Sequence, residues 1–85
     1  MIKTANIISI MTDSTLNNTK KGNTVVVLNL PQGELKSQFI RLGITEGSLV
    51  KVYERLPGGT VVLQKNRQEI AVGSELAKKI KVVVQ

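Results

Sequence analysis

The sequence contains no cysteine, no histidine and no tryptophan. Without cysteine the chain has no disulfide, no thiolate metal site and no cysteine nucleophile. Without histidine it lacks the commonest general base and the commonest transition-metal ligand, which closes most Ser-His-Asp and Cys-His catalytic schemes. The residues that remain predict a protein that is not an enzyme and that carries no cofactor.

Aromatic residues are also scarce, since Phe39 and Tyr53 are the only two. Basic residues, in contrast, are in excess: twelve Lys and Arg against six Asp and Glu give the 85 residues a net charge of +6. A basic surplus suits nucleic acid, an anionic membrane surface or an acidic protein as partner. No run of residues approaches the ~18 consecutive apolar residues of a spanning helix, so a role at a membrane would be peripheral.

The first part of the chain differs in composition from the rest. Residues 12–24 are mostly Thr, Asn, Ser, Lys and Gly, a composition that is typical of a flexible lead-in. We therefore predict a flexible N-terminal extension over residues 1–23 and one folded domain over residues 24–85.

From residue 24 onward, short β-branched runs alternate with turn residues and predict five strands. One helix follows the first strand, because Leu35, Phe39 and Leu42 share a helical face at i, i+4 and i+7. One helical turn precedes the last strand. Strands this short and closely spaced favour a sheet that closes into a barrel, because closure removes exposed sheet edges. We therefore predict a mainly β fold, a small SH3-like barrel. The predicted strands cover residues 25–28, 49–55, 61–65, 68–72 and 81–84.

Two turns carry a backbone prediction. Gly43 follows the predicted helix, where a left-handed residue commonly ends a helix. Asn66 and Arg67 separate two strands, and Asn tolerates a positive φ better than most residues, so we expect a tight hairpin there.

Several segments occur in a characteristic order and spacing. They are Leu30–Leu35, Phe39–Gly47, Val50–Val52, Pro57–Gly59, Ile70–Val72 and Ala77–Val82. The most specific spacing is L-G-I-x-x-G-x-x-V, followed later by I-A-V and A-x-x-I-x-V. Together these segments resemble the FeoA domain family, the small cytoplasmic component of bacterial ferrous iron uptake. The same domain type recurs, more distantly, as the C-terminal module of some iron-dependent repressors.

The sequence departs from the family pattern at three places. Gln38 stands where the family usually has an arginine, the loop Pro57–Thr60 is shorter than the family loop, and Asn66 replaces a hairpin glycine. The basic residues of the family are therefore not carried over to this chain.

The resemblance implies an accessory, regulatory role in ferrous iron uptake without catalysis. FeoA-like proteins are thought to act with a large membrane permease that carries a cytoplasmic GTPase domain. The implied partner is that ferrous iron permease, and the implied location is the cytoplasm, including the inner face of the membrane. Whether the chain activates the GTPase or assembles the complex stays open, and so does a homo-oligomer.

Two segments are candidate partner-binding sites. The first is the exposed side of the helix, because helix faces can dock as units and interfaces favour arginine. Its residues are Glu34, Lys36, Gln38 and Arg41. The second is the loop Leu56, Pro57 and Gly58, whose leucine would anchor a partner. The alternatives are an ordinary solvated helix surface and a turn whose leucine tucks into the end of the barrel.

The competing hypothesis is a small basic barrel that binds nucleic acid. Lys78, Lys79 and Lys81 cluster near the end of the sequence, but no aromatic residue is interleaved with them. Without a base-stacking platform, a protein partner is favoured and no nucleic acid is expected. No metal site is predicted, because ferrous sites normally include imidazole and the carboxylates show no ligand spacing. The carboxylates concerned are Glu34, Glu46, Glu54, Glu69 and Glu75.

Overall fold

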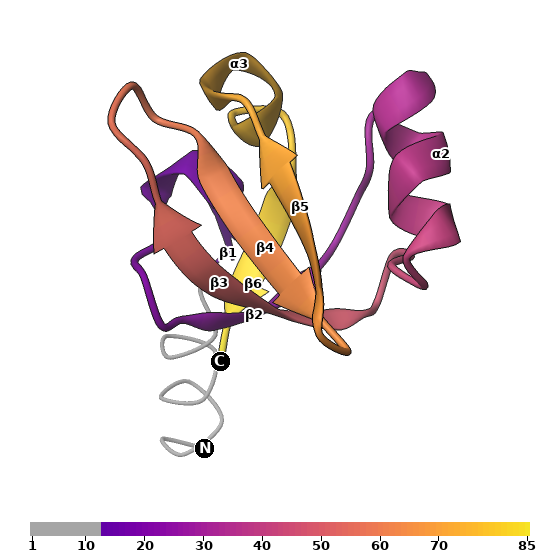
Figure 1. Cartoon of the computed structure of the whole chain (residues 1–85), viewed down its shortest axis with the longest axis horizontal. Helices are drawn as coiled ribbons and strands as arrows, with labels where there is room; N and C mark the ends of the chain where they lie inside the picture. The colour runs from indigo at the N-terminus through magenta and orange to yellow at the C-terminus, as the bar shows by residue number, and fades with distance from the viewer. Residues whose placement is uncertain (1–12) are drawn as a thin grey trace, which may run out of the picture.

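The computed structural model describes residues 13–85. Six strands form one antiparallel sheet in the order β1-β6-β2-β3-β4-β5 (Figure 1). The strands are β1 (Asp13–Thr15), β2 (Thr24–Val27), β3 (Leu49–Arg55), β4 (Val61–Lys65), β5 (Gln68–Val72) and β6 (Lys81–Val84). The helical elements are η1 (Leu16–Asn18), α2 (Glu34–Arg41) and α3 (Ser74–Ala77). The mainly β fold is confirmed, with the predicted helix, helical turn and strands, and with β1 and η1 in addition.

The sheet begins before the residue that the sequence predicted. Strand β1 pairs with β6, with Asp13 opposite Val83 and Thr15 opposite Lys81. The next residue, Leu16, has no exposed surface and belongs to the core. The prediction of a flexible extension is therefore wrong for residues 13–23, because one buried leucine and one strand pairing outweigh a polar composition. Residues 1–12 lie outside the described part of the chain.

Arg55 ties this early segment to the body of the fold. Its Nη1 donates a hydrogen bond to the carbonyl oxygen of Asn17 at 2.9 Å and a second one to that of Thr19. Thr19 is itself buried, and its hydroxyl donates to the carbonyl oxygen of Leu16 at 2.7 Å. The guanidinium thus satisfies two backbone acceptors where the chain passes from η1 towards β2.

The core lies on the inner side of the sheet and is entirely aliphatic except for Phe39. Along β3, Val50 and Val52 are buried while Leu49 and Lys51 are exposed, which is the alternation of a strand with one buried face. The buried apolar residues are Leu16, Val25, Val27, Leu30, Phe39, Ile44, Val50, Val52, Val61, Leu63, Ile70, Val72, Ala77, Ile80 and Val82.

Both turn predictions are confirmed. Asn66 and Arg67 have φ values of 52° and 68°, the left-handed conformation that a two-residue hairpin requires. Gly43 has a φ of 79°, and its N–H donates to the carbonyl oxygen of Ile40 at 2.9 Å. The N–H of Ile44 then bonds to the carbonyl oxygen of Phe39 at 2.8 Å. These two hydrogen bonds end the helix and direct the chain from the end of α2 back into the core at Ile44.

Candidate functional site

Helix α2 stands beside the edge strand β5, with α3 beyond the upper end of that strand (Figure 1). The helix is held there by one apolar face: Phe39 is fully buried, and Leu35 and Leu42 pack against the core. Glu34 in its first turn and Arg41 in its last turn complement the helix dipole. The other side of α2 remains in solvent, including Ile40, which is 52% exposed.

A cleft separates the first half of α2 from the sheet. Its volume is about 330 Å³, and it is formed by the segment before α2, by α2 itself, by β5 and by α3. The lining residues are Pro31, Gln32, Glu34, Leu35, Gln38, Ala71 and Leu76. Leucine, alanine and proline side chains supply apolar walls, while Glu34 and the two glutamines supply polar groups. Protein interfaces commonly combine apolar and polar groups in this way.

The helix candidates only partly coincide with this cleft. Glu34 and Gln38 line it, whereas Lys36 and Arg41 belong to the same helix but not to the lining. Leu35 and Leu76 also line the cleft, although the sequence indicated only a packing role for Leu35. Leu76 is 37% exposed, and its position depends on how α3 meets β5, which no local pattern reveals.

The second candidate segment lies elsewhere. Leu56, Pro57 and Gly58 form the turn between β3 and β4, on the side of the molecule away from α2 (Figure 1). All three are exposed, and Leu56 retains 43% of its surface, so it does not tuck into the end of the sheet. The structure therefore does not bring the two predicted segments together into one site.

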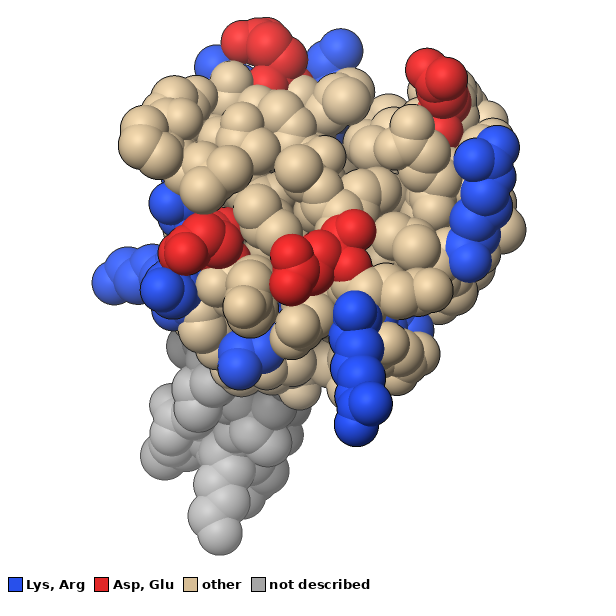
Figure 2. All heavy atoms as spheres, viewed as in Figure 1, with Lys and Arg blue, Asp and Glu red and all other residues tan. Residues whose placement is uncertain are grey.

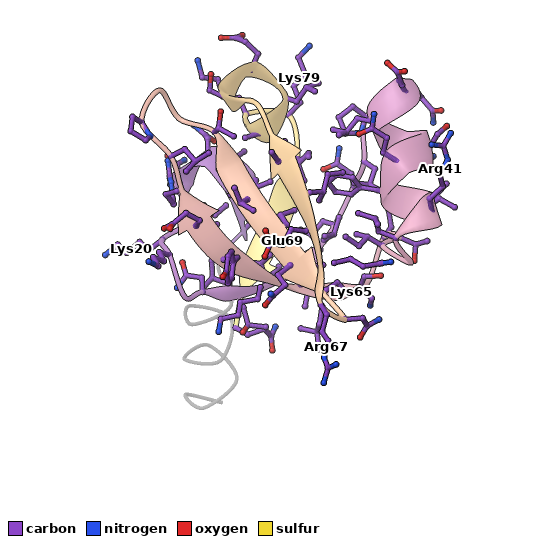
Figure 3. The ribbon with its side chains drawn as sticks, viewed as in Figure 1. Lys20, Arg41, Lys65, Arg67, Glu69 and Lys79 are labelled. Atoms are coloured by element: carbon purple, nitrogen blue, oxygen red, sulfur yellow. The ribbon has the colours of Figure 1, made fainter. Side chains whose placement is uncertain are left out.

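Basic side chains are distributed around the molecule. In Figure 3, Lys20, Lys79, Arg41 and Arg67 point outward on different sides. Figure 2 likewise shows blue side chains separated by broad tan and red areas on this face. The described residues thus present several isolated positive charges on the face shown, in place of a continuous basic stripe. Such scattering gives little support to a nucleic-acid groove.

Within residues 13–85, no three acidic side chains gather in a way that could hold a metal ion. No helix in the same range has the length and apolar character needed to cross a membrane.

The sequence matches the model of a known domain family. The model of the FeoA domain matches residues 14–84, which is most of the sequence. The chain belongs to the FeoA domain family. The match starts ten residues before the predicted domain boundary, at Ser14 in β1. The FeoA resemblance drawn from the sequence is therefore confirmed, and the family is one associated with ferrous iron transport.

Solved structures agree on the fold. A crystal structure of an iron uptake regulatory protein (FeoA) is 21% identical, with a TM-score of 0.73, over 88% of this chain and all of that chain. A solution structure of the FeoA protein from Chlorobium tepidum is 20% identical, with a TM-score of 0.73, over 84% of this chain and 70% of that one. A manganese-dependent transcriptional repressor is 22% identical, with a TM-score of 0.70, over 88% of this chain but 43% of its own. No curated protein sequence matches the chain significantly.

Proposed function

We propose that this FeoA-domain protein is a cytoplasmic accessory protein of bacterial ferrous iron uptake. It acts without catalysis, by direct contact with the ferrous iron permease that carries a GTPase domain. The observation that carries this proposal is the FeoA family match over residues 14–84. The scarcity of catalytic side chains in the sequence points the same way, since the chain has no histidine or cysteine.

The cleft between α2, β5 and α3 is the surface that best suits such a contact. It combines exposed apolar groups with polar groups, and it is built on a helix and a strand that are anchored in the core by Phe39 and Ile70. Sites on such elements hold their geometry better than sites on loops. The Leu56 turn lacks this support, because its three residues are exposed.

The test is uptake of radioactive Fe²⁺ by iron-limited bacteria whose copy of the gene is deleted. We expect uptake to fall on deletion and to return with the wild-type gene. Affinity capture of the protein from solubilised membranes should enrich the permease. Normal uptake in the deletion strain under iron limitation would refute the proposed function.

A matched pair of variants locates the contact. Leu76→Ser removes an apolar side chain from the cleft, whereas Leu49→Ser removes an even more exposed leucine, 55% exposed, from β3 outside the cleft. We expect only Leu76→Ser to lower uptake and permease capture. Equal effects of the two variants would place the contact elsewhere on the protein.

A further inference from the structure

Strand β5 presents unpaired backbone groups beside the cleft. It is the last strand in the sheet order and pairs with β4 alone among the described strands. The two-residue turn makes Lys65 and Gln68 the hydrogen-bonded pair that closes the hairpin. Because such pairs alternate along an antiparallel ladder, the N–H and C=O groups of Glu69 and Ala71 point away from β4. Ala71 is the residue of β5 that lines the cleft.

This edge lacks several of the features that protect sheet edges. Natural edge strands are commonly protected by prolines, bulges, charged side chains, very short length or a covering helix or loop. The opposite edge, β1, has three residues, whereas β5 has five and pairs with β4 without a register shift. Its sequence, QEIAV, contains no proline and no lysine. Although α2 stands beside this edge (Figure 1), the cleft leaves space next to Ala71, and another strand can add to β5 there.

The one charged residue that lines the cleft is acidic, opposite in sign to the net charge of the protein. Glu34 lines the cleft, and Glu69 lies two residues from Ala71 on the same exposed face of β5. Glu75 precedes Leu76 in α3. Figure 2 shows a red side chain over the start of α2, and over α3 a red side chain with blue ones on both sides of it. Within residues 13–85 the ion pairs are Lys21–Glu54 and Lys78–Glu75, so Glu34 and Glu69 have no basic partner there.

We infer that the cleft binds an extended, basic segment of a partner protein, which adds to β5 as an antiparallel strand. A leucine-sized side chain of the segment lies opposite Ala71, between Leu35 and Leu76. Lysine or arginine two residues to either side lies near Glu34 and Glu69. This inference rests on the proposed function only for the identity of the partner, and it specifies the chemistry of the partner's segment.

The binding mode follows from strand geometry. The residue opposite Ala71 exchanges two backbone hydrogen bonds with it, its N–H to the Ala71 carbonyl and its C=O to the Ala71 N–H. Its side chain lies on the same face of the extended sheet as that of Ala71, which is the face that lines the cleft. Backbone pairing then supplies affinity while the leucine and the flanking charges supply specificity. Antiparallel addition continues the pattern of every pair in the sheet.

The first test uses a synthetic peptide, Ac-Thr-Lys-Thr-Leu-Thr-Lys-Thr-amide, titrated into the isotopically labelled protein at low salt. We expect saturable amide shifts in β5, in the first half of α2 and in α3. The control peptide carries glutamate in place of both lysines, and we expect it to bind about tenfold more weakly. Because the protein has a net charge of +6, non-specific attraction would favour that acidic control. Absence of saturable shifts, or equal binding of the two peptides, would overturn the inference.

Backbone pairing is tested by replacing one peptide amide with an ester, which removes the N–H at little steric cost. An ester at the central leucine should weaken binding about three- to tenfold, because one hydrogen bond is lost. An ester at the threonine that follows should have little effect, since its N–H points away from β5. The reverse order would mean parallel addition, and equal effects would mean that no strand is added; either result contradicts the proposed mode.

Variants of the protein separate this inference from the proposed function. Ala71→Pro removes the N–H that faces the cleft and leaves the ladder to β4 intact, as proline is tolerated on an edge. We expect Ala71→Pro and Leu76→Ser to abolish peptide binding, with Leu49→Ser as the unaffected control. If deletion lowers iron uptake but these two variants support normal uptake, the cleft inference fails and the function stands. If β5 amide shifts depend on protein concentration without peptide, the occupant is a second copy and the inference is wrong.

Discussion

Replacing Arg55 with methionine should weaken the attachment of the segment that carries β1 and η1 to strand β3. Methionine keeps much of the aliphatic stem of arginine but cannot donate to the carbonyl oxygens of Asn17 and Thr19. A hydrogen bond to a charged group contributes about 1.5–3 kcal/mol in general. Arg55 is only partly buried, so solvent screening reduces the sum, and we expect a loss of about 2 kcal/mol from the free energy of unfolding. For a domain of this size that loss lowers the melting temperature by roughly 10 °C.

The assay is thermal and urea unfolding followed by circular dichroism, with Arg41→Met as the matched control. Arg41 is exposed on α2 and makes no ion pair within residues 13–85, so its replacement should change stability by less than about 0.5 kcal/mol. Hydrogen exchange supplies a local readout, because the N–H of Leu16 donates to the carbonyl oxygen of Ile80 at 2.9 Å. That amide should exchange faster in Arg55→Met. Equal melting temperatures for the two variants, or unchanged exchange at Leu16, would refute the assigned role of Arg55.

Two further predictions concern the end of α2 and the choice of partner. Gly43→Val should lower the free energy of unfolding by about 2 kcal/mol or more, because φ at Gly43 is 79° and a β-branched residue rarely adopts that conformation. An added Cβ would meet no close neighbour, since the nearest atom is Lys65 Cε at 3.9 Å. Gly43→Asn, whose side chain tolerates a positive φ, should therefore cost clearly less in the same urea titration. The protein should bind generic duplex DNA weakly at low salt and with a shallow salt dependence, because the basic residues labelled in Figure 3 lie on different sides of the molecule. Tight binding with a steep salt dependence would instead support the nucleic-acid alternative.

The elements that the sequence predicted are those whose signals are local. The spacing of Leu35, Phe39 and Leu42 is enough to define α2 and its buried face, and Asn66 with Arg67 is enough to define the hairpin. Each depends on residues within one or two turns of chain, where periodicity and turn chemistry act directly.

The elements that escaped prediction depend on long-range contacts. Arg55 reaches Asn17 across 38 positions of sequence, and β1 is a strand only because β6 lies beside it. A composition rich in Thr, Asn and Ser indicates a loop wherever such a partner cannot be foreseen. The same holds for the cleft, since Ala71 and Leu76 become its walls only when α2 is placed against β5. The helix candidates Glu34 and Gln38 do line the cleft, but the sequence predicted only an exposed helix face there, and the other side of the cleft could not be inferred from it.

The order of the strands also has a consequence for how the protein is made. Strand β6, which follows the other five described strands in the chain, occupies an interior position between β1 and β2. Until residues 81–84 emerge from the ribosome, both neighbours lack their shared partner, and β2 carries an open edge that can recruit strands from other nascent chains. Completion of the sheet therefore waits for contacts of high sequence separation, which form slowly. A transcript or protease product that ends before Lys81 would lose two ladders at once, and we expect it to aggregate during synthesis.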